Sequence, residues 1–231
     1  MCGITGMLGA SSGCTSDRET VVRRMTTSLL HRGPDSEGYW VEDEVALGHR
    51  RLSILDLSEA GAQPMHSVCG RYAIAFNGEI YNHVEMRRDL EKVGAAPTWQ
   101  GHSDTETLLA GVAQWGLDET LQRAAGMFAI AMWDRARKHL LLARDRVGEK
   151  PLYWGWAGQT LVFGSELKAL RQHPDCPKDI CREALAQFLT YAYVPAPRSI
   201  HPGIYKLEPG CILEIAGPPP SAPPTGTCQR L

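Results

Sequence analysis

The chain has 231 residues, of which 43% are hydrophobic and 22% are charged, a composition typical of a globular domain. Its formal net charge of −2 gives no electrostatic reason to expect binding to nucleic acid or to an anionic membrane. The longest mainly apolar run, residues 124–133, is far shorter than the roughly 20 residues of a transmembrane helix, and the N-terminus lacks the pattern of a signal peptide.

The cysteines indicate the redox environment. Seven are present, an odd number at irregular spacing, and none forms the Cys-x-x-Cys pair of a zinc or dithiol site. This usage favours a reduced, cytoplasmic protein whose thiols are mostly inert.

The N-terminal half alternates strands and helices. Residues 3–8 read as a strand, and residues 18–31 as a helix that Asp17 caps and Gly33-Pro34 ends. Ser103 and Glu106 have capping-box spacing, which predicts a helix that ends at Gly116. The other expected elements here are strands over 45–56 and 71–76 and a helix over 82–93.

The second half contains several short strands that follow one another directly. The expected elements are strands over 127–133, 139–144 and 160–164, a helix over 180–190 and a final strand over 211–215. Because no regular strand–helix–strand repeat is present, we expect an α+β protein with two layers of mainly antiparallel strands covered by helices. The segment from Pro218 has five prolines in seven residues, which is typical of an extended linker or tail.

The start of the chain is the sharpest chemical feature. Met1 is followed by the small residue Cys2, so removal of Met1 would place a thiol and a free α-amine on one residue. With a reference pKa of about 7.7–8.0, that amine can act as a base near neutral pH and activate the thiol. Taken by itself, the same pattern is also consistent with a chance cysteine after the initiator.

Three other segments supply parts that an amide hydrolase needs. Asn77-Gly78 offers a side-chain amide beside a glycine N–H, a suitable pair of donors for an oxyanion, although Asn-Gly alone more commonly marks a hairpin turn. Arg51 could hold a substrate carboxylate by two parallel hydrogen bonds, or be a surface arginine. Asp104 could bind a substrate ammonium group, or only cap its helix. The spacing of His102, Asp104 and Glu106 makes a metal site a weak alternative, and we expect none.

The ordered set of motifs resembles the N-terminal glutaminase domain of glutamine-hydrolysing asparagine synthetases, which are class II glutamine amidotransferases. The matching segments cover residues 1–210 and include Met1-Cys2-Gly3-Ile4, His31-Arg32-Gly33-Pro34-Asp35, Arg51-Leu52-Ser53-Ile54-Leu55-Asp56, Gly61-Ala62-Gln63-Pro64-Met65, Asn77-Gly78-Glu79-Ile80-Tyr81-Asn82, Ser103-Asp104-Thr105-Glu106, Arg144-Asp145-Arg146, Gly148-Glu149-Lys150-Pro151-Leu152-Tyr153 and Ser165-Glu166-Leu167-Lys168-Ala169-Leu170.

The resemblance implies a four-layer αββα sandwich, the fold of N-terminal-nucleophile hydrolases, in which Cys2 attacks the carboxamide of L-glutamine and releases ammonia. It implies that Asn77 and the Gly78 N–H form the oxyanion hole. The other implied roles are binding of the α-carboxylate by Arg51, binding of the α-amino group by Glu79 and Asp104, and coupling between domains by Arg32.

The sequence departs from this family in one respect. The Ser-Gly-Gly-x-Asp-Ser motif of the ATP-pyrophosphatase synthetase domain does not occur in the 231 residues. We therefore expect an amidotransferase domain over 1–210 and a final strand with a proline-rich linker or tail over 211–231. No cofactor is expected here, because ATP and magnesium belong to the missing synthetase domain, whether covalent or separate, that would accept the ammonia.

Two alternatives stay open at the level of sequence. One is an N-terminal-nucleophile amidase that acts on another amide, against which Arg51 and Asp104 argue because they suit a free amino acid. The other is a non-catalytic module that docks on a synthetase, which gains weight if Met1 is retained.

Overall fold

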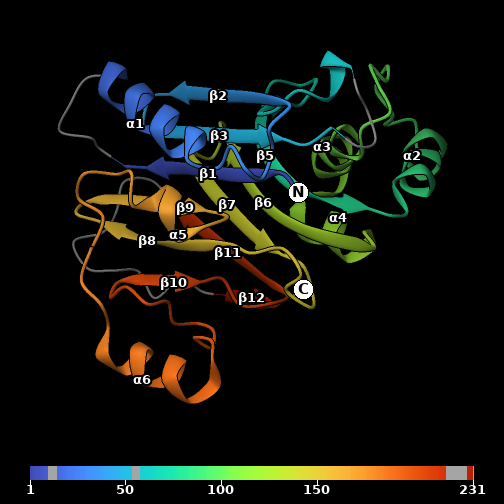
Figure 1. Ribbon diagram of the computed structural model, residues 1–231. Helices are drawn as coiled ribbons and strands as arrows, with labels where there is room; N and C mark the ends of the chain where they lie inside the picture. Colours follow the sequence, from blue (N-terminus) through green and yellow to red (C-terminus); the bar gives the residue numbers. More distant parts are fainter. Residues whose placement is uncertain (10–14, 54–57, 217–227, 231) are drawn as a thin grey trace.

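The structure, a computed structural model, describes residues 1–9, 15–53, 58–216 and 228–230 and contains two six-stranded sheets flanked by helices (Figure 1). All strand pairings within the described residues are antiparallel. In spatial order, the first sheet contains β10 (Ile204–Lys206), β8 (Tyr153–Ala157), β9 (Thr160–Gly164), β1 (Gly3–Leu8), β3 (Val45–Arg51) and β2 (Ser36–Glu42). The second contains β12 (Cys228–Arg230), β11 (Cys211–Ala216), β7 (His139–Arg144), β6 (Gly126–Asp134), β5 (Tyr72–Ile80) and β4 (Met65–His66).

The helices lie outside the two sheets or at their ends. They are α1 (Thr15–Thr27), α2 (His83–Lys92), α3 (Asp104–Trp115), α4 (Leu117–Arg123), α5 (Leu167–Leu170) and α6 (Arg182–Tyr191), with a short 3-10 turn over Glu59–Gly61. No helix in the described ranges is long and apolar enough to cross a membrane.

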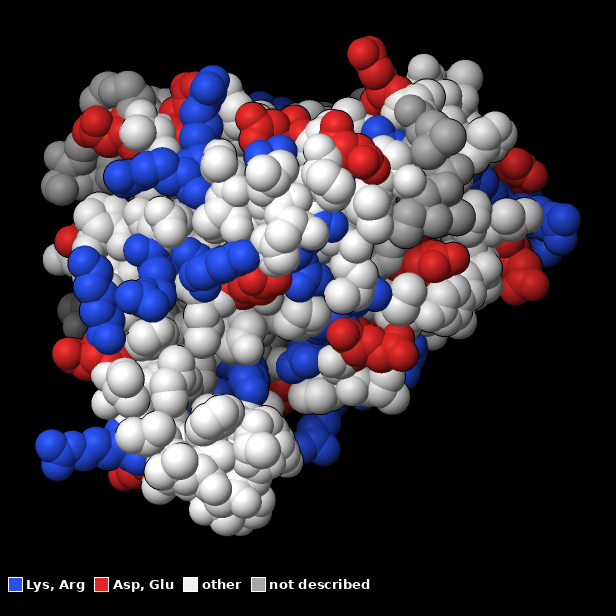
Figure 2. Space-filling model, in the orientation of Figure 1, with Lys and Arg blue, Asp and Glu red and all other residues white. Residues whose placement is uncertain are grey.

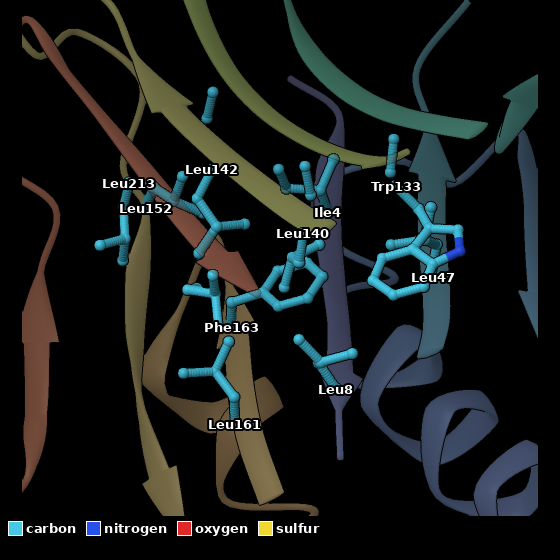
Figure 3. Packing of buried hydrophobic residues seen from close by; sticks show 14 of the residues in the cluster. Ile4, Leu8, Leu47, Trp133, Leu140, Leu142, Leu152, Leu161, Phe163 and Leu213 are labelled. Atoms are coloured by element: carbon cyan, nitrogen blue, oxygen red, sulfur yellow. The ribbon is translucent and has the colours of Figure 1, made fainter. Parts of the chain in front are cut away.

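Three separate apolar cores define the layers. The central core lies between the sheets and includes Ile4, Trp133 and Phe163, all fully buried (Figure 3). Two outer cores pack α1 and α5 against the first sheet and α3 and α4 against the second. Strand alternation explains this division, because Ile4 and Leu8 of β1 face the central core while Met7 faces the outer one. The α+β fold class, a four-layer αββα sandwich, is thus confirmed.

Several sequence predictions need correction at the element boundaries. Helix α1 begins at Thr15, so Asp17 lies in its first turn and is not the cap; the carboxylate still suits the positive end of the helix dipole. The helix ends at Thr27, although Leu29 in the following turn is still buried. The predicted strand over 211–215 is present as β11, which lies between β12 and β7 in its sheet. The proline-rich residues 217–227 lie outside the described residues.

The largest correction concerns Asn77-Gly78, which is not a turn. Strand β5 runs unbroken to Ile80 and pairs with β6 along its whole length. Gly78 lies opposite Phe128, and a Cβ atom at Gly78 would be 2.3 Å from the Met127 carbonyl oxygen. The glycine is therefore required by close approach of the neighbouring strand and not by a hairpin.

The cysteines also differ from expectation. Cys2, Cys69, Cys176 and Cys181 are free thiols, as expected, but Cys211 is disulfide-bonded.

Candidate active site

A cavity of about 120 Å³ lies where the start of β1, the end of β3, the edge of β5 and the start of α3 meet. Its walls include all six residues predicted to bind or cleave the substrate. These are Cys2, Arg51, Asn77, Gly78, Glu79 and Asp104. Residues more than 100 positions apart in the chain are thus brought together at one end of the sandwich.

Cys2 immediately precedes β1 and is only partly exposed. Its sulfur accepts a hydrogen bond from the Leu52 N–H at 3.4 Å and lies 3.6 Å from the Leu52 carbonyl oxygen. These contacts attach the thiol to the residue that follows Arg51. Met1 also lines the cavity, and while it is present the nitrogen of Cys2 is a peptide nitrogen without basic character.

The outer edge of β5 presents a row of backbone N–H groups to the site. Phe128, opposite Gly78, uses its own N–H and C=O in hydrogen bonds with Asp145, at 3.2 and 2.9 Å. Antiparallel pairing then requires Gly78 to turn its N–H away from β6. The N–H groups two residues before and after it point the same way, because Phe76 donates to Gln63 and Ile80 donates to Asp104. The Gly78 N–H therefore faces the cavity that this residue lines.

Asn77 supplies the second donor. Its side chain is 1% exposed, yet the amide nitrogen Nδ2 has no hydrogen-bond partner among the described residues. Burying a donor without an acceptor lowers the stability of the folded state by about 1–3 kcal/mol. Such donors occur at functional sites, where a ligand supplies the acceptor. Together with the Gly78 N–H, this amide can stabilise an oxyanion in the cavity.

Two charged groups suit the two ends of a free amino acid. Arg51 ends β3, lines the cavity and donates from Nη1 to the Ser58 carbonyl at 2.8 Å. Asp104 begins α3 and is 5% exposed. Its Oδ2 accepts the Ile80 N–H at 2.8 Å, and burial raises the pKa of this carboxyl above its usual value despite that hydrogen bond. Glu79, two residues beyond Asn77, adds a partly buried carboxylate on the same face of β5.

Arg32 lies beside the nucleophile but does not line the cavity. Its Nε donates to the Cys2 carbonyl at 2.9 Å and its Nη1 to Glu166 at 3.0 Å. His31 and Lys168 also contact the Glu166 carboxylate, at 2.9 and 3.4 Å. Burial raises the pKa of Glu166, but the hydrogen bonds from His31 and Arg32 outweigh it and leave the pKa below its usual value. The structure thus places Arg32 as a support for the backbone of Cys2.

Sequence reasoning assigned no role in the site to several polar residues of the cavity wall, among them His49, Gln63, Thr105 and Lys150. His49 is 1% exposed and contacts the Phe76 carbonyl through Nε2 at 3.0 Å, while burial lowers its pKa to about 4, so the ring is neutral at pH 7. The Lys150 ammonium lies 3.5 Å from the Met1 sulfur. Gln63, Thr105 and Lys150 lie within the motifs quoted above, but the order of residues in the sequence does not indicate these contacts.

The metal alternative gains no support from the geometry. Within the described ranges no cluster of three or more His, Cys, Asp or Glu side chains is arranged to hold a metal ion. Glu106 instead accepts hydrogen bonds from the Gln100 N–H and from Arg87.

Residues 1–218 match a family model described as a glutamine amidotransferase domain. The chain is 39% identical over 216 residues to asparagine synthetase [glutamine-hydrolyzing] 1 of Bacillus subtilis and 33% identical over 223 residues to amidase chry2 of Gibberella zeae. These alignments cover 93% and 92% of this chain but 33% and 32% of the relatives, so the chain spans about a third of their length.

Solved structures show the same fold at lower sequence identity. The glutamine phosphoribosylpyrophosphate amidotransferase of B. subtilis superposes with a TM-score of 0.70 at 20% identity, covering 99% of this chain and 49% of that one. The likeness extends over almost all of the sandwich.

Proposed function

The chain belongs to the family of glutamine amidotransferase domains, and we propose that it hydrolyses L-glutamine to glutamate and ammonia with Cys2 as the nucleophile. One observation carries the proposal. A partly buried thiol, an unpaired buried amide donor and a cavity-facing N–H share one small cavity with an arginine and an aspartate.

The first half of the reaction forms a thioester. After Met1 is removed, the α-amine of Cys2 takes the thiol proton, and the sulfur attacks the side-chain carboxamide carbon of glutamine. Negative charge develops on the carboxamide oxygen, where Asn77 Nδ2 and the Gly78 N–H donate to it. The α-ammonium of Cys2 donates its proton to the amide nitrogen, and the intermediate collapses by breaking the carbon–nitrogen bond, so that the nitrogen leaves as ammonia.

The second half releases glutamate. The same α-amine takes a proton from water, which attacks the thioester carbon, and the oxyanion forms again in the same hole. The carbon–sulfur bond then breaks, glutamate leaves, and the α-ammonium returns the proton to the Cys2 sulfur. Arg32, which donates to the Cys2 carbonyl, holds the backbone of the nucleophile in place through both steps.

Substrate choice follows from charge. Arg51 would bind the α-carboxylate, and Asp104 and Glu79 would bind the α-ammonium group. A substrate without these two charges, such as an N-acylated amide, would leave a buried carboxylate unpaired, so we expect it to be a poor substrate. This favours glutamine over the amide substrates of other N-terminal-nucleophile amidases.

We further propose that the ammonia passes to a synthetase partner equivalent to the remaining two thirds of the relatives, for asparagine synthesis with ATP and magnesium bound only by that partner. An exposed apolar face on α6 supports docking of such a partner. Leu185, Phe188 and Leu189 are 39%, 47% and 76% exposed at helical spacing, near the exposed Tyr191 at the end of the helix. The surface at this end of the molecule is mainly uncharged (Figure 2, bottom). A cytoplasmic location, where such a partner would reside, is part of the same proposal.

The hydrolytic function is tested by intact-protein mass together with ammonia release from glutamine. We expect loss of Met1, glutamine-dependent ammonia release, and none from Cys2→Ala. Retention of Met1 with no ammonia release would favour the non-catalytic docking module instead, and faster release from asparagine or an N-acyl amide would contradict the roles of Arg51 and Asp104.

The partner proposal is tested in a chimera in which this chain replaces the matching third of the B. subtilis relative. We expect asparagine formation from glutamine, aspartate, ATP and magnesium. Leu189→Ser should reduce synthesis from glutamine while leaving synthesis from added ammonia unchanged. Equal yields in the two chimeras would exclude α6 as the docking face.

A further inference from the structure

Four hydrogen bonds link Phe76 to Ile80 along the outer edge of β5, and the backbone of the strand between these two residues closes them into a ring. The Phe76 N–H donates to Gln63 Oε1 at 2.6 Å, and Gln63 Nε2 donates to Thr105 Oγ1 at 3.2 Å. The Thr105 hydroxyl donates to Asp104 Oδ1 at 3.5 Å, and Asp104 Oδ2 accepts the Ile80 N–H at 2.8 Å. The ring thus begins and ends on the same strand, four residues apart.

The donors and acceptors of the ring are fixed by chemistry. A backbone N–H can only donate, so the Gln63 atom that contacts Phe76 must be the amide oxygen, which directs its NH₂ group to Thr105. The Thr105 hydroxyl, having accepted that bond, has one proton left, and the nearby Asp104 oxygen accepts it. The chain of bonds has one consistent direction, from Phe76 to Asp104.

The ring takes the place that a neighbouring strand would occupy. Strand β4 pairs with β5 only at Ile74 and Ala73. Beyond that point, Gln63 satisfies the Phe76 N–H and Asp104 satisfies the Ile80 N–H, whereas the Gly78 N–H between them faces the cavity. One site on the edge is left for an acceptor from a ligand.

We propose that Gln63 and Thr105 are positioning residues for glutamine. They fix Asp104 for the substrate ammonium and hold the β5 edge so that the Gly78 N–H is available to the carboxamide oxygen. This inference rests on the proposed glutamine hydrolysis and adds a role for two side chains that do no chemistry themselves. Because the ring ties the oxyanion hole to the ammonium site, both ends of the substrate are placed by one structure.

The experiment compares the isosteric variants Gln63→Met and Thr105→Val in the full chain with Met1 removed. Each removes ring bonds at nearly constant volume. Each variant breaks two of the four bonds, and we expect the KM for glutamine to rise about 10-fold through weaker placement of the ammonium site, while kcat changes less. The double variant should be no worse than the poorer single variant, because a broken ring cannot be broken again.

Controls separate positioning from general damage. Thr105→Ser keeps the hydroxyl and should restore a KM within about twofold of the unmodified chain. Gln172→Met and Thr190→Val make the same chemical changes at exposed positions on α5's C-terminal side and on α6, and should leave KM unchanged. Calorimetric titration of glutamine into Cys2→Ala, with and without Thr105→Val, gives binding without turnover and should show the same roughly 10-fold loss.

The outcomes distinguish the two proposals. If the processed chain itself releases no ammonia from glutamine, the proposed function fails. If it is active but Gln63→Met and Thr105→Val keep its KM and glutamine affinity, or if Thr105→Ser is as impaired as Thr105→Val, the ring has no positioning role. Strict additivity of the two losses would also contradict a closed ring.

Discussion

The two edges of β5 show how one strand serves both stability and function. Its inner edge pairs with β6 over all nine residues, from Tyr72 to Ile80, in continuous register. Its outer edge pairs with only two residues of β4, after which side chains and a cavity take over. The inner edge leaves no backbone group for a ligand, whereas the outer edge keeps the Gly78 N–H for one. The site therefore lies where strand pairing stops.

The sharpest test of the outer edge is Asn77→Ala. We expect kcat for glutamine hydrolysis to fall by about 10²–10³, the usual effect of losing one oxyanion donor. Thermal stability should hold or rise slightly, since the variant removes a buried donor that has no partner. A large drop in melting temperature with nearly normal kcat in the remaining folded protein would mean that Asn77 is structural.

The contact between His49 in β3 and the Phe76 carbonyl in β5 joins the two sheets beside the cavity, and we expect stability to depend on pH through this histidine. His49 has a pKa of about 4 in the folded chain against 6.5 unfolded, so between these values the unfolded state binds more protons. Stability should therefore fall as pH drops from about 7 to 4, by up to about 3 kcal/mol from this residue.

Urea unfolding of the unmodified chain and of His49→Gln across that range isolates the contribution of His49. The free energy of unfolding of the variant should fall less as the pH drops, because the glutamine side chain can donate to the Phe76 carbonyl without titrating. His66, His83 and His173 also have lowered pKa values and contribute equally to both curves. Parallel curves would show that His49 does not govern this edge.

Substitution of Arg51, which lines the cavity from the end of β3, is expected to have a smaller effect on activity than substitution of Asn77. Arg51→Ala should raise the KM for glutamine about 10- to 100-fold through loss of a charge-assisted hydrogen bond to the α-carboxylate, with little change in unfolding free energy. Arg51→Lys should recover part of this, since it keeps the charge but not the paired donors. A collapse in melting temperature with unchanged kinetics would assign Arg51 to structure.

The central core between the sheets gives the complementary result. Phe163→Ala in the central core should lower the free energy of unfolding by about 3–5 kcal/mol. Because Phe163 does not line the cavity, the KM for glutamine in the remaining folded protein should change less than twofold. A KM change as large as that of Arg51→Ala would mean that the core and the site are not separable.

The sequence allowed prediction of the layers because hydrophobic alternation is a local property. Strand β1, over Gly3–Leu8, is an example, and its two faces pack into two different cores. Asn77-Gly78 shows the limit. Local chemistry favours a turn for this dipeptide, but pairing with β6 imposes a strand, and that pairing is set by residues about 50 positions away. Gln63 could not be assigned a role from sequence because its partners, Phe76 and Thr105, come from separate segments.

The most direct test of the central claim is covalent labelling with an electrophilic glutamine analogue, followed by peptide mass spectrometry. Four described cysteines, Cys2, Cys69, Cys176 and Cys181, are free thiols and could react. We predict one adduct, on an N-terminal peptide that begins at Cys2, which excess glutamine prevents and Asn77→Ala slows. An adduct on Cys69 or on another thiol, or labelling of Cys2 that glutamine does not prevent, would contradict a glutamine site at the open edge of β5.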